Sequence, residues 1–334
     1  IDAIIADPAG ATIPTELDRL WVLVSFLVAG AQNDGILKIV PTLLPRLPVE
    51  GEELYAQGFD MQLGGGLPAT MIHLARLGVP VDFSTFLGKG NISAFIEGHL
   101  RASGAAYRNI YQGSGEPVTV TSVLILPTDR SFVSRCEDIV YTDEMKQALL
   151  EQFRGAKILR MGLELMDVYK QLKKENPGVI LVLDESWRDD LSLSRYGDYL
   201  ALADYYTPNH QEAQKITGQP TPEKALETLA PYLRAPLVKV GDRGCLVMAE
   251  GQITQVPTLP LEGPVVDTTG AGDAFIAGLM YGLYHDAPLT RCVALGNIMG
   301  GVCVQHVGCL TGRITAGELE AKAQRILDMM EGKA

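Results

Sequence analysis

The sequence predicts an α/β fold in which helices cover both faces of a mainly parallel sheet, with a small antiparallel β lid made of two insertions. From residue 141 onward, short apolar segments alternate with helical stretches, which is typical of a parallel sheet with right-handed crossovers. Earlier in the chain, two stretches carry apolar residues at almost every second position, as half-exposed antiparallel strands do. We therefore expect a large α/β body with a small sheet standing off it.

The lid is expected in the N-terminal half of the chain. Residues 1–20 show little periodicity and are predicted to be an arm that precedes a single domain over 21–334. The domain is predicted to begin with a buried strand over Trp21–Ala29. The two lid segments are expected at about 31–63, where alternation ends at Leu63, and at about 105–136, which has the pattern of a hairpin.

The body is predicted to be built from regularly alternating elements. The expected strands are Val79–Leu87, Lys157–Gly162, Val179–Asp184, Tyr205–Thr207 and Leu237–Gly241, with an edge hairpin over Cys245–Ala249 and Ile253–Val256. The expected helices include Leu67–Leu77, Ile92–Ala102, Ala274–His285 and Leu289–His306.

Composition bounds the class of protein. The chain has 334 residues, of which 47% are hydrophobic and 20% charged, as in a globular protein with a real core. The net charge of −12 argues against a nucleic-acid partner, because phosphate backbones recruit basic surfaces. The five cysteines form no Cys-x-x-Cys pair, so a reduced, cytoplasmic protein is expected. No N-terminal apolar run reaches the about 20 residues of a membrane span, so no membrane partner is expected.

The strongest chemical signal is the segment Val266–Phe275, which reads Val-Asp-Thr-Thr-Gly-Ala-Gly-Asp-Ala-Phe. Small residues at a helix start leave backbone N–H groups open to a ligand, and a helix N-terminus favours an anion. Asp273 is expected in the first turn, where it can accept a proton from a substrate hydroxyl. Backbone donors and a base together make a phosphoryl-transfer site. The local pattern alone fits equally a glycine-rich turn whose acid stabilises the helix.

Asp267–Asp273 resembles the signature of the ribokinase-like (PfkB) carbohydrate kinases. Further motifs follow the family's order: Gly64-Gly65 with Leu74–Gly78, the Asn-x-x-Glu of Thr207–Glu212, and Lys239–Gly244. The resemblance covers about residues 21 to 315 and implies a ribokinase-like fold. It also implies an ATP-dependent, Mg²⁺-dependent transfer to a hydroxyl of a small sugar-like alcohol, and a homodimer through the lid.

The resemblance implies a role for each motif residue. Asp273 would be the general base, and Gly270, Ala271 and Gly272 would form the anion hole. Asn209 and Glu212 would organise Mg²⁺ through water, which suits an ion that keeps several waters. The nucleotide would be bound by Asn209, Lys239, Gly241, Gly244 and Asn297, and a K⁺ ion by Asp267 and Thr269. Without the resemblance, Asn209–Glu212 is more simply a capping box and Gly241–Gly244 a tight turn.

The resemblance also implies contacts with the acceptor substrate from Asp34, Gly64, Gly65, Glu164 and Arg130. From the residues alone, these acids fit a turn and a helix start, and Arg130 fits a solvated hairpin. Two departures from the family concern this side of the site: Ala69 replaces an Asn that binds substrate in many members, and Gly66 stands where some members have Lys. Together with the acidic composition, the missing Lys predicts an uncharged acceptor.

Three other functions are compatible with parts of the sequence. Gly64-x-Gly66-x-x-Ala69 matches a dinucleotide-binding fingerprint, but the alternating segment before it does not resemble a buried parallel strand. A nucleoside kinase on the same fold and a non-catalytic binding protein remain alternatives. The intact Asp273 argues against the non-catalytic alternative, because binding alone needs no base.

Overall fold

The computed structural model describes residues 21–23, 37–42, 46–55, 58–125, 130–135, 139–185, 187–249 and 251–333. Its largest sheet has six strands in the order β10-β9-β8-β1-β4-β5. Every pair of neighbours in this sheet is parallel, which confirms the predicted parallel body. Its strands are β1 (Trp21–Leu23), β4 (Val81–Thr85), β5 (Ala106–Asn109), β8 (Ala156–Met161), β9 (Ile180–Leu183) and β10 (Tyr205–Tyr206). Of the strand predicted over Trp21–Ala29, the residues after Leu23 lie outside the described part.

Helices cover both faces of this sheet, as the sequence predicts. Adjacent strand residues point to opposite faces, and they enter different apolar clusters: Ile158 packs in one, and Leu159 in the other. The first cluster includes residues of α2 (Gly66–Arg76), α3 (Asn91–Ser103), α9 (Ala271–Tyr284), α10 (Leu289–Cys303) and α11 (Ala316–Met330). The second includes residues of α4 (Asp143–Phe153), α5 (Met166–Glu175), α6 (Leu193–Leu202), α7 (His210–Thr217) and α8 (Pro222–Leu229).

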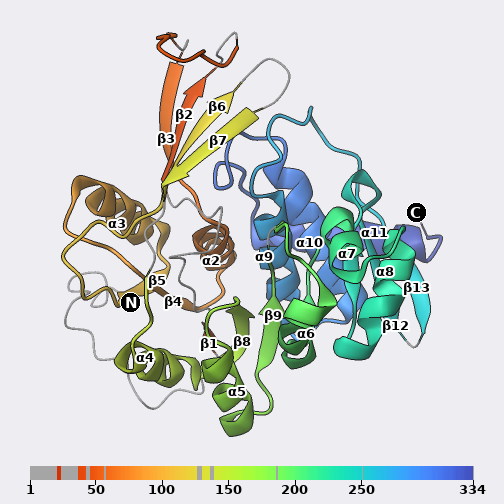
Figure 1. Ribbon diagram of the computed structural model, residues 1–334. Helices are drawn as coiled ribbons and strands as arrows, with labels where there is room; N and C mark the ends of the chain where they lie inside the picture. The colour runs from red at the N-terminus through yellow and green to blue at the C-terminus, as the bar shows by residue number, and fades with distance from the viewer. Residues whose placement is uncertain are drawn as a thin grey trace.

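A four-stranded sheet stands off the body and forms the predicted lid (Figure 1). Its order is β3-β2-β6-β7, with β2 (Leu37–Thr42), β3 (Gly58–Leu63), β6 (Val120–Ile125) and β7 (Arg130–Arg135). The β2–β3 and β6–β7 pairs are antiparallel, but β2 and β6 pair in parallel. The lid is therefore made of two antiparallel pairs, one from each insertion, as expected, and the two pairs meet through a parallel contact at its centre.

Two expected placements are corrected. The start of the second lid segment forms β5, which pairs with β4 in the large sheet after the α3 crossover. Leu237–Gly241 was expected in the parallel sheet. Instead, β11 (Leu237–Lys239) pairs antiparallel with β12 (Cys245–Ala249), which pairs with β13 (Gln252–Val256) in a separate sheet. An isolated parallel bridge from Asn209 to Lys239 joins that sheet to the end of β10.

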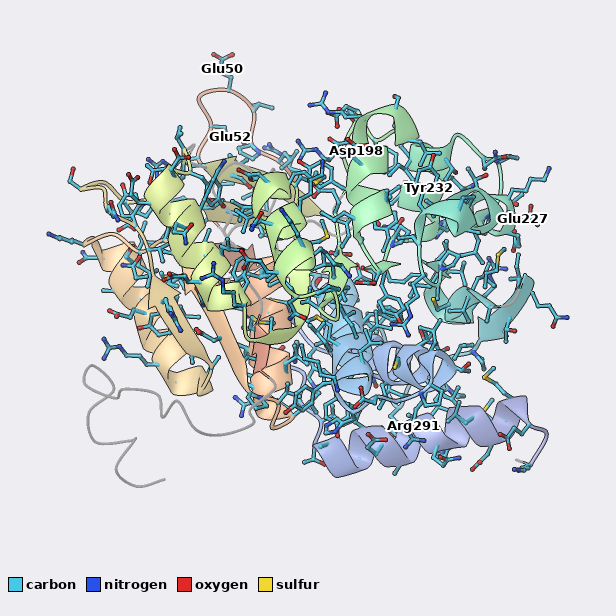
Figure 2. The ribbon with its side chains drawn as sticks, turned by 90° about the horizontal axis from the view of Figure 1, so that it is seen from below. Glu50, Glu52, Asp198, Glu227, Tyr232 and Arg291 are labelled. Atoms are coloured by element: carbon cyan, nitrogen blue, oxygen red, sulfur yellow. The ribbon has the colours of Figure 1, made fainter. Side chains whose placement is uncertain are left out.

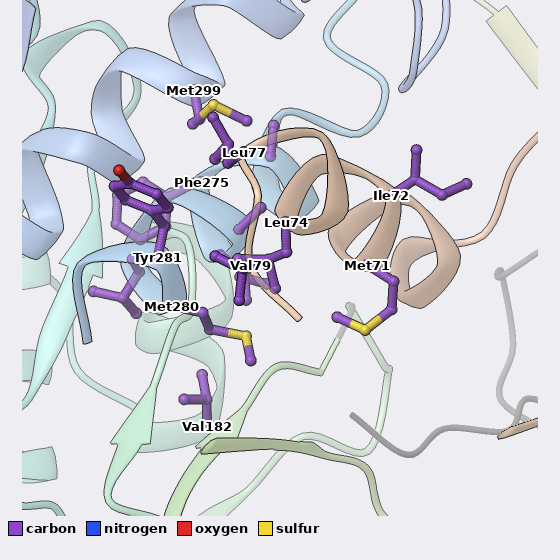
Figure 3. Close-up of a cluster of buried hydrophobic side chains, with 14 of the residues drawn as sticks. Met71, Ile72, Leu74, Leu77, Val79, Val182, Phe275, Met280, Tyr281 and Met299 are labelled. Carbon is purple, nitrogen blue, oxygen red and sulfur yellow. The ribbon is translucent and has the colours of Figure 1, made fainter. Parts of the chain in front are cut away.

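The helix α9 lies at the centre of the body, between α2 and α10. Figure 3 shows Leu74 of α2, and Leu77 directly after that helix, beside Phe275 of α9 and Met299 of α10. All of α9 from Ala274 to Leu283 is buried. Glycines allow the close α9–α10 approach: a Cβ on Gly278 would lie 2.5 Å from the carbonyl oxygen of Leu295.

Several acidic residues lie at the surface. Glu50, Asp198 and Glu227 are exposed and point outward, as Figure 2 shows. Within the described residues, no helix combines the length and hydrophobicity needed to cross a membrane.

Candidate active site

Polar side chains meet where β8, β9 and β10 end. Arg160 lies near the end of β8, Asp184 directly follows β9, and Thr207 directly follows β10. Asp273, in the first turn of α9, reaches the same place. This edge, at the carboxyl ends of parallel strands, is where open α/β sheets bind their ligands.

The α9 N-terminus has the geometry that the sequence predicts. Gly270 is the N-cap residue, with a left-handed φ of 81°. A Cβ on Gly270 would overlap Cβ of Cys309, so both the backbone conformation and the packing require glycine here. The turn therefore presents Ala271, Gly272 and Asp273 at the positive end of a helix that is buried from Ala274 to Leu283.

The Asp273 side chain is held by a buried arginine. Nη2 of Arg160 lies 3.2 Å from Oδ1 of Asp273 and 3.0 Å from Oδ2 of Asp184. Nη1 of the same guanidinium donates to Gly66 O at 2.7 Å and to Oγ1 of Thr70 at 2.6 Å. Arg160 is only 5% exposed, so these interactions replace its solvation.

A lysine adjoins this cluster. Nζ of Lys239 lies 3.8 Å from Oδ1 of Asp184, which also accepts a bond from Oγ1 of Thr207 at 2.7 Å. A Cβ on Gly272 would lie 3.2 Å from the same Nζ. The lysine ammonium is therefore placed directly beside the turn that begins α9.

The Asn209–Glu212 segment forms a capping box. Oδ1 of Asn209 accepts from Glu212 N at 2.9 Å, and Oε2 of Glu212 accepts from Asn209 N at 2.8 Å. Burial raises the pKa of Glu212, and the nearby Lys239 acts in the opposite direction. The simpler interpretation of this motif is thus confirmed, and a metal-organising role has to operate from within the cap.

A pocket of about 160 Å³ is lined by the loop after β13 and by residues of α10 and α11. Its lining includes Leu259, Leu261, Asn297, Ile298, Lys322 and Arg325. Nδ2 of Asn297 donates to Val256 O at 2.9 Å and to Pro257 O at 3.0 Å. Gly244, with a φ of 91°, packs against the same loop, where a Cβ would overlap Val256 O. Gly241 begins the short 3₁₀ turn that leads to Gly244.

The loop before α9 is closed by Asp267. Oδ1 of Asp267 accepts from Thr269 N, and Oδ2 accepts from Gly308 N, both at 2.9 Å. Sγ of Cys303 lies 3.4 Å from Thr269 O. The carboxylate that was expected to bind K⁺ therefore also fixes the backbone of the loop.

The residues expected to bind the acceptor are only partly described. Gly64 and Gly65 are buried between β3 and α2, and Gly65 caps α2 by accepting from Ala69 N at 3.1 Å. Glu164 is half-buried, and its charge raises the pKa values of Tyr141 and Tyr169, although burial is the larger cause. Arg130 begins β7, where it pairs with Ile125. Asp34 lies outside the described residues.

Sequence reasoning did not single out Arg160, Asp184 or Thr70 as part of the site. One signal was available: Arg160 is a charged residue among the apolar Ile158, Leu159 and Met161 of β8, and buried charges require partners. Thr70 gave no such signal, because a threonine in an apolar helix is ordinary.

The chain belongs to the pfkB family of carbohydrate kinases, whose family model matches residues 39–316. It is therefore a kinase of that family, acting on a sugar or a nucleoside. It is 28% identical over 302 residues to the ribokinase of Arabidopsis thaliana, a match that covers 85% of this chain and 77% of that protein. It is 24% identical over 285 residues to adenosine kinase 1 of the same organism, covering 76% of this chain and 82% of that protein.

Solved structures establish the fold. The structure of Arabidopsis thaliana ribokinase, described as complexed with ribose and ATP, superposes with a TM-score of 0.76 at 23% identity. The match covers 92% of this chain and 99% of that one. The fold is thus that of the ribokinases, as the sequence predicts. Some relatives are longer than this chain, which spans 56% of the bifunctional protein HldE of Pseudomonas putida.

Proposed function

We propose that the protein transfers the γ-phosphoryl group of ATP to a hydroxyl of a small, uncharged sugar-like alcohol, with Asp273 as general base. The observation that carries this proposal is the position of Asp273. Its carboxylate lies in the first turn of a buried helix, behind a glycine that supplies the αL cap, at the carboxyl edge of a parallel sheet. The arrangement combines backbone donors with a base, which phosphoryl transfer requires.

In this mechanism the acceptor hydroxyl loses its proton to Asp273 as its oxygen attacks the γ-phosphorus. The bond from γ-phosphorus to the bridging oxygen breaks, and ADP leaves with that electron pair. N–H groups at Gly270, Ala271 and Gly272, aided by the α9 dipole, stabilise the charge on the transferred group. The ammonium of Lys239, which approaches Gly272, adds positive charge at the same point.

The nucleotide is assigned to the other half of the site. The pocket beside Asn297, with Gly241 and Gly244 in the preceding turn, would take the base, and its apolar floor suits a planar ring. Mg²⁺ enters with ATP as part of the substrate. Asn209 and Glu212 fit its water shell, because the one side-chain oxygen of Asn209 and Oε2 of Glu212 are committed to the cap.

The acceptor is assigned to the space between the lid and the carboxyl edge of the sheet. Gly64 and Gly65 join the lid strand β3 to α2 there, and we place Asp34, Glu164 and Arg130 around the same space. Closure of the lid would exclude water, which otherwise competes as acceptor. A homodimer through the lid and K⁺ at Asp267 and Thr269 are retained as proposals. Equal rates in K⁺ and tetramethylammonium would remove the K⁺ proposal.

The test is ADP release from Mg·ATP with a panel of uncharged sugars, polyols, sugar acids and nucleosides. We expect one class of acceptor to be active, and Asp273→Asn to lower kcat about a hundredfold to ten-thousandfold while nucleotide binding is kept. Asp286→Asn is the matched control, because it removes a carboxylate just beyond the other end of α9. An Asp273→Asn variant whose rate is close to that of the wild type would refute the assignment of Asp273 as general base.

A nucleoside is the second candidate acceptor, favoured by the match to adenosine kinase 1. Activity confined to the nucleosides of the panel would select it over a free sugar. Nucleotide binding without any turnover would favour the non-catalytic alternative.

A further inference from the structure

We propose that Arg160 is a positioning residue for the base: it holds the Asp273 carboxylate through Oδ1 and keeps the base ionised at low pH. The inference rests on the proposed function of Asp273 and goes beyond it. It assigns a role to a buried side chain of β8 that none of the sequence motifs contains.

The geometry excludes a role for the two Nη groups in binding the substrate. Nη1 donates to Gly66 O and to Thr70, and Nη2 donates to Asp184 and to Asp273. Each Nη carries two protons, so all four are used within the protein. A ligand anion would have to displace one of these buried bonds, which the 5% exposure of Arg160 opposes.

The same contacts fix the orientation of the base. The bond from Nη2 of Arg160 to Oδ1 holds the Asp273 carboxylate from the β8 side. Oγ1 of Thr70 lies 3.0 Å from Gly66 O and 3.2 Å from the backbone carbonyl of Asp273, and its single proton is shared between these two acceptors. Thr70 and Gly66 belong to the first turns of α2, directly after the lid strand β3. The base is therefore anchored to the element that connects the lid to the body.

The charges around Asp273 set the pH range of the base. Arg160 of β8 is the cation in contact with it, and Lys239 of β11 approaches the neighbouring Gly272. Asp184 after β9 shares Arg160 and pairs with Lys239. More distant groups are Glu212 of α7, Asp267 before α9 and His73 of α2, whose Nε2 lies 2.8 Å from Cys309 O. An adjacent cation favours the ionised carboxylate, and an adjacent anion opposes it.

The position of Arg160 also gives a physical account of Gly66. A Cβ on Gly66 would lie 2.5 Å from Oδ1 of Asp273 and 3.2 Å from Nη2 of Arg160. A side chain at this position would therefore displace the base from its arginine. Glycine at 66 and arginine at 160 are two parts of one arrangement, in which the cation reaches the site from β8.

Two variants with opposite expected effects test the inference, with kcat/KM for the acceptor measured from pH 4.5 to 9 at saturating Mg·ATP. Arg160→Gln removes the cation, so the acid limb should move to higher pH by about one unit or more. Its kcat at pH 8 should fall about tenfold to a hundredfold. Asp184→Asn removes a neighbouring anion and a competitor for Arg160, so its acid limb should move to lower pH.

Arg154→Gln is the matched control, because Arg154 precedes the opposite end of β8 and pairs with Glu175 on the surface. It should leave the limb unchanged. In Arg160→Lys the acid limb of the kcat/KM profile should lie between those of Arg160→Gln and the wild type. Lysine keeps the positive charge but lacks the planar set of guanidinium N–H donors. An unchanged limb in Arg160→Gln overturns the inference while leaving Asp273 as base. If Arg160→Gln fails to fold, Asp184→Asn decides the matter. The inference is overturned if the acid limb of its kcat/KM profile lies at the same pH as in the wild type or at a higher pH. Failure of the proposed function is distinguishable, because Asp273→Asn would then retain activity.

Discussion

The two halves of the proposed active site use polar side chains in different ways. On the acceptor side, Arg160, Asp184 and Asp273 bind one another, so the side chains themselves form a buried charged network. On the nucleotide side, Asn209 and Asn297 bind the backbone and shape a helix start and a loop. Substitutions on the acceptor side should therefore change charge and chemistry, whereas those on the nucleotide side should change shape and affinity.

Gly66→Ala should have the largest effect and should fall on kcat alone. The new Cβ would lie 2.5 Å from Oδ1 of Asp273, and a displaced base is expected to lower kcat at least about a hundredfold. Steady-state kinetics beside nucleotide titration measures it. Gly98→Ala on α3 is the control, because a Cβ there meets no atom within 4 Å. Weakened nucleotide binding in Gly66→Ala would contradict the expectation that substitutions on the acceptor side leave nucleotide affinity unchanged.

Asn297→Ala, on the nucleotide side, should change stability and the KM for ATP rather than kcat. It leaves two backbone carbonyls without their donor, so the free energy of unfolding should fall by about 1–3 kcal/mol. The KM for ATP should rise while kcat changes little. Denaturant unfolding and ATP titration measure the two effects. Asn297→Asp, which keeps the shape but removes the donor, should resemble Asn297→Ala. A loss confined to kcat would contradict the assignment.

Glu185→Gln should change how stability depends on pH. Burial raises the pKa of Glu185 to about 7, and the hydrogen bond from Arg188 acts in the opposite direction. Because the folded pKa lies above the ordinary 4.5, the folded state favours the protonated acid, and the wild type loses stability as pH rises from about 4.5 through 7. The variant does not ionise, so its stability relative to wild type should grow by about 1–3 kcal/mol between pH 5 and 8.

Chemical denaturation at each pH measures that difference. Glu175→Gln is the control, because Glu175 is an exposed partner of Arg154 and its pKa is lowered. If the difference in the free energy of unfolding between Glu185→Gln and the wild type were constant with pH, burial would not be raising the pKa of Glu185.

The smallest effect is expected from Asn209→Ala, compared with Thr315→Ala. Both remove the first residue of a capping box, on α7 and on α11 respectively, so each should lower stability by about 1 kcal/mol. Only Asn209→Ala should also raise the Mg²⁺ concentration needed for half-maximal rate. Identical Mg²⁺ curves for the two variants would leave Asn209 as a cap and nothing more.

The sequence predicted the features that depend on local pattern. The alternation around Leu63, the strand–helix repeat after residue 141 and the Gly270–Asp273 turn all appear as expected. Pairing partners were less accessible, because β11 shows the same short apolar pattern whether it joins a parallel or an antiparallel neighbour. The contacts of Arg160 were also out of reach. They join residues about 24 to 113 positions apart, which only the strand order brings together.

The burial of α9 determines which part of the enzyme can move during turnover. Its residues from Ala274 to Leu283 are all buried, whereas β7 of the lid exposes Val133. Amide hydrogens in α9 should therefore exchange with solvent only through global unfolding, and those of the lid through local opening. If Asp273 is the proposed base, substrate can enter and product can leave while it keeps its place, because it adjoins the buried stretch of α9 that we expect to open last.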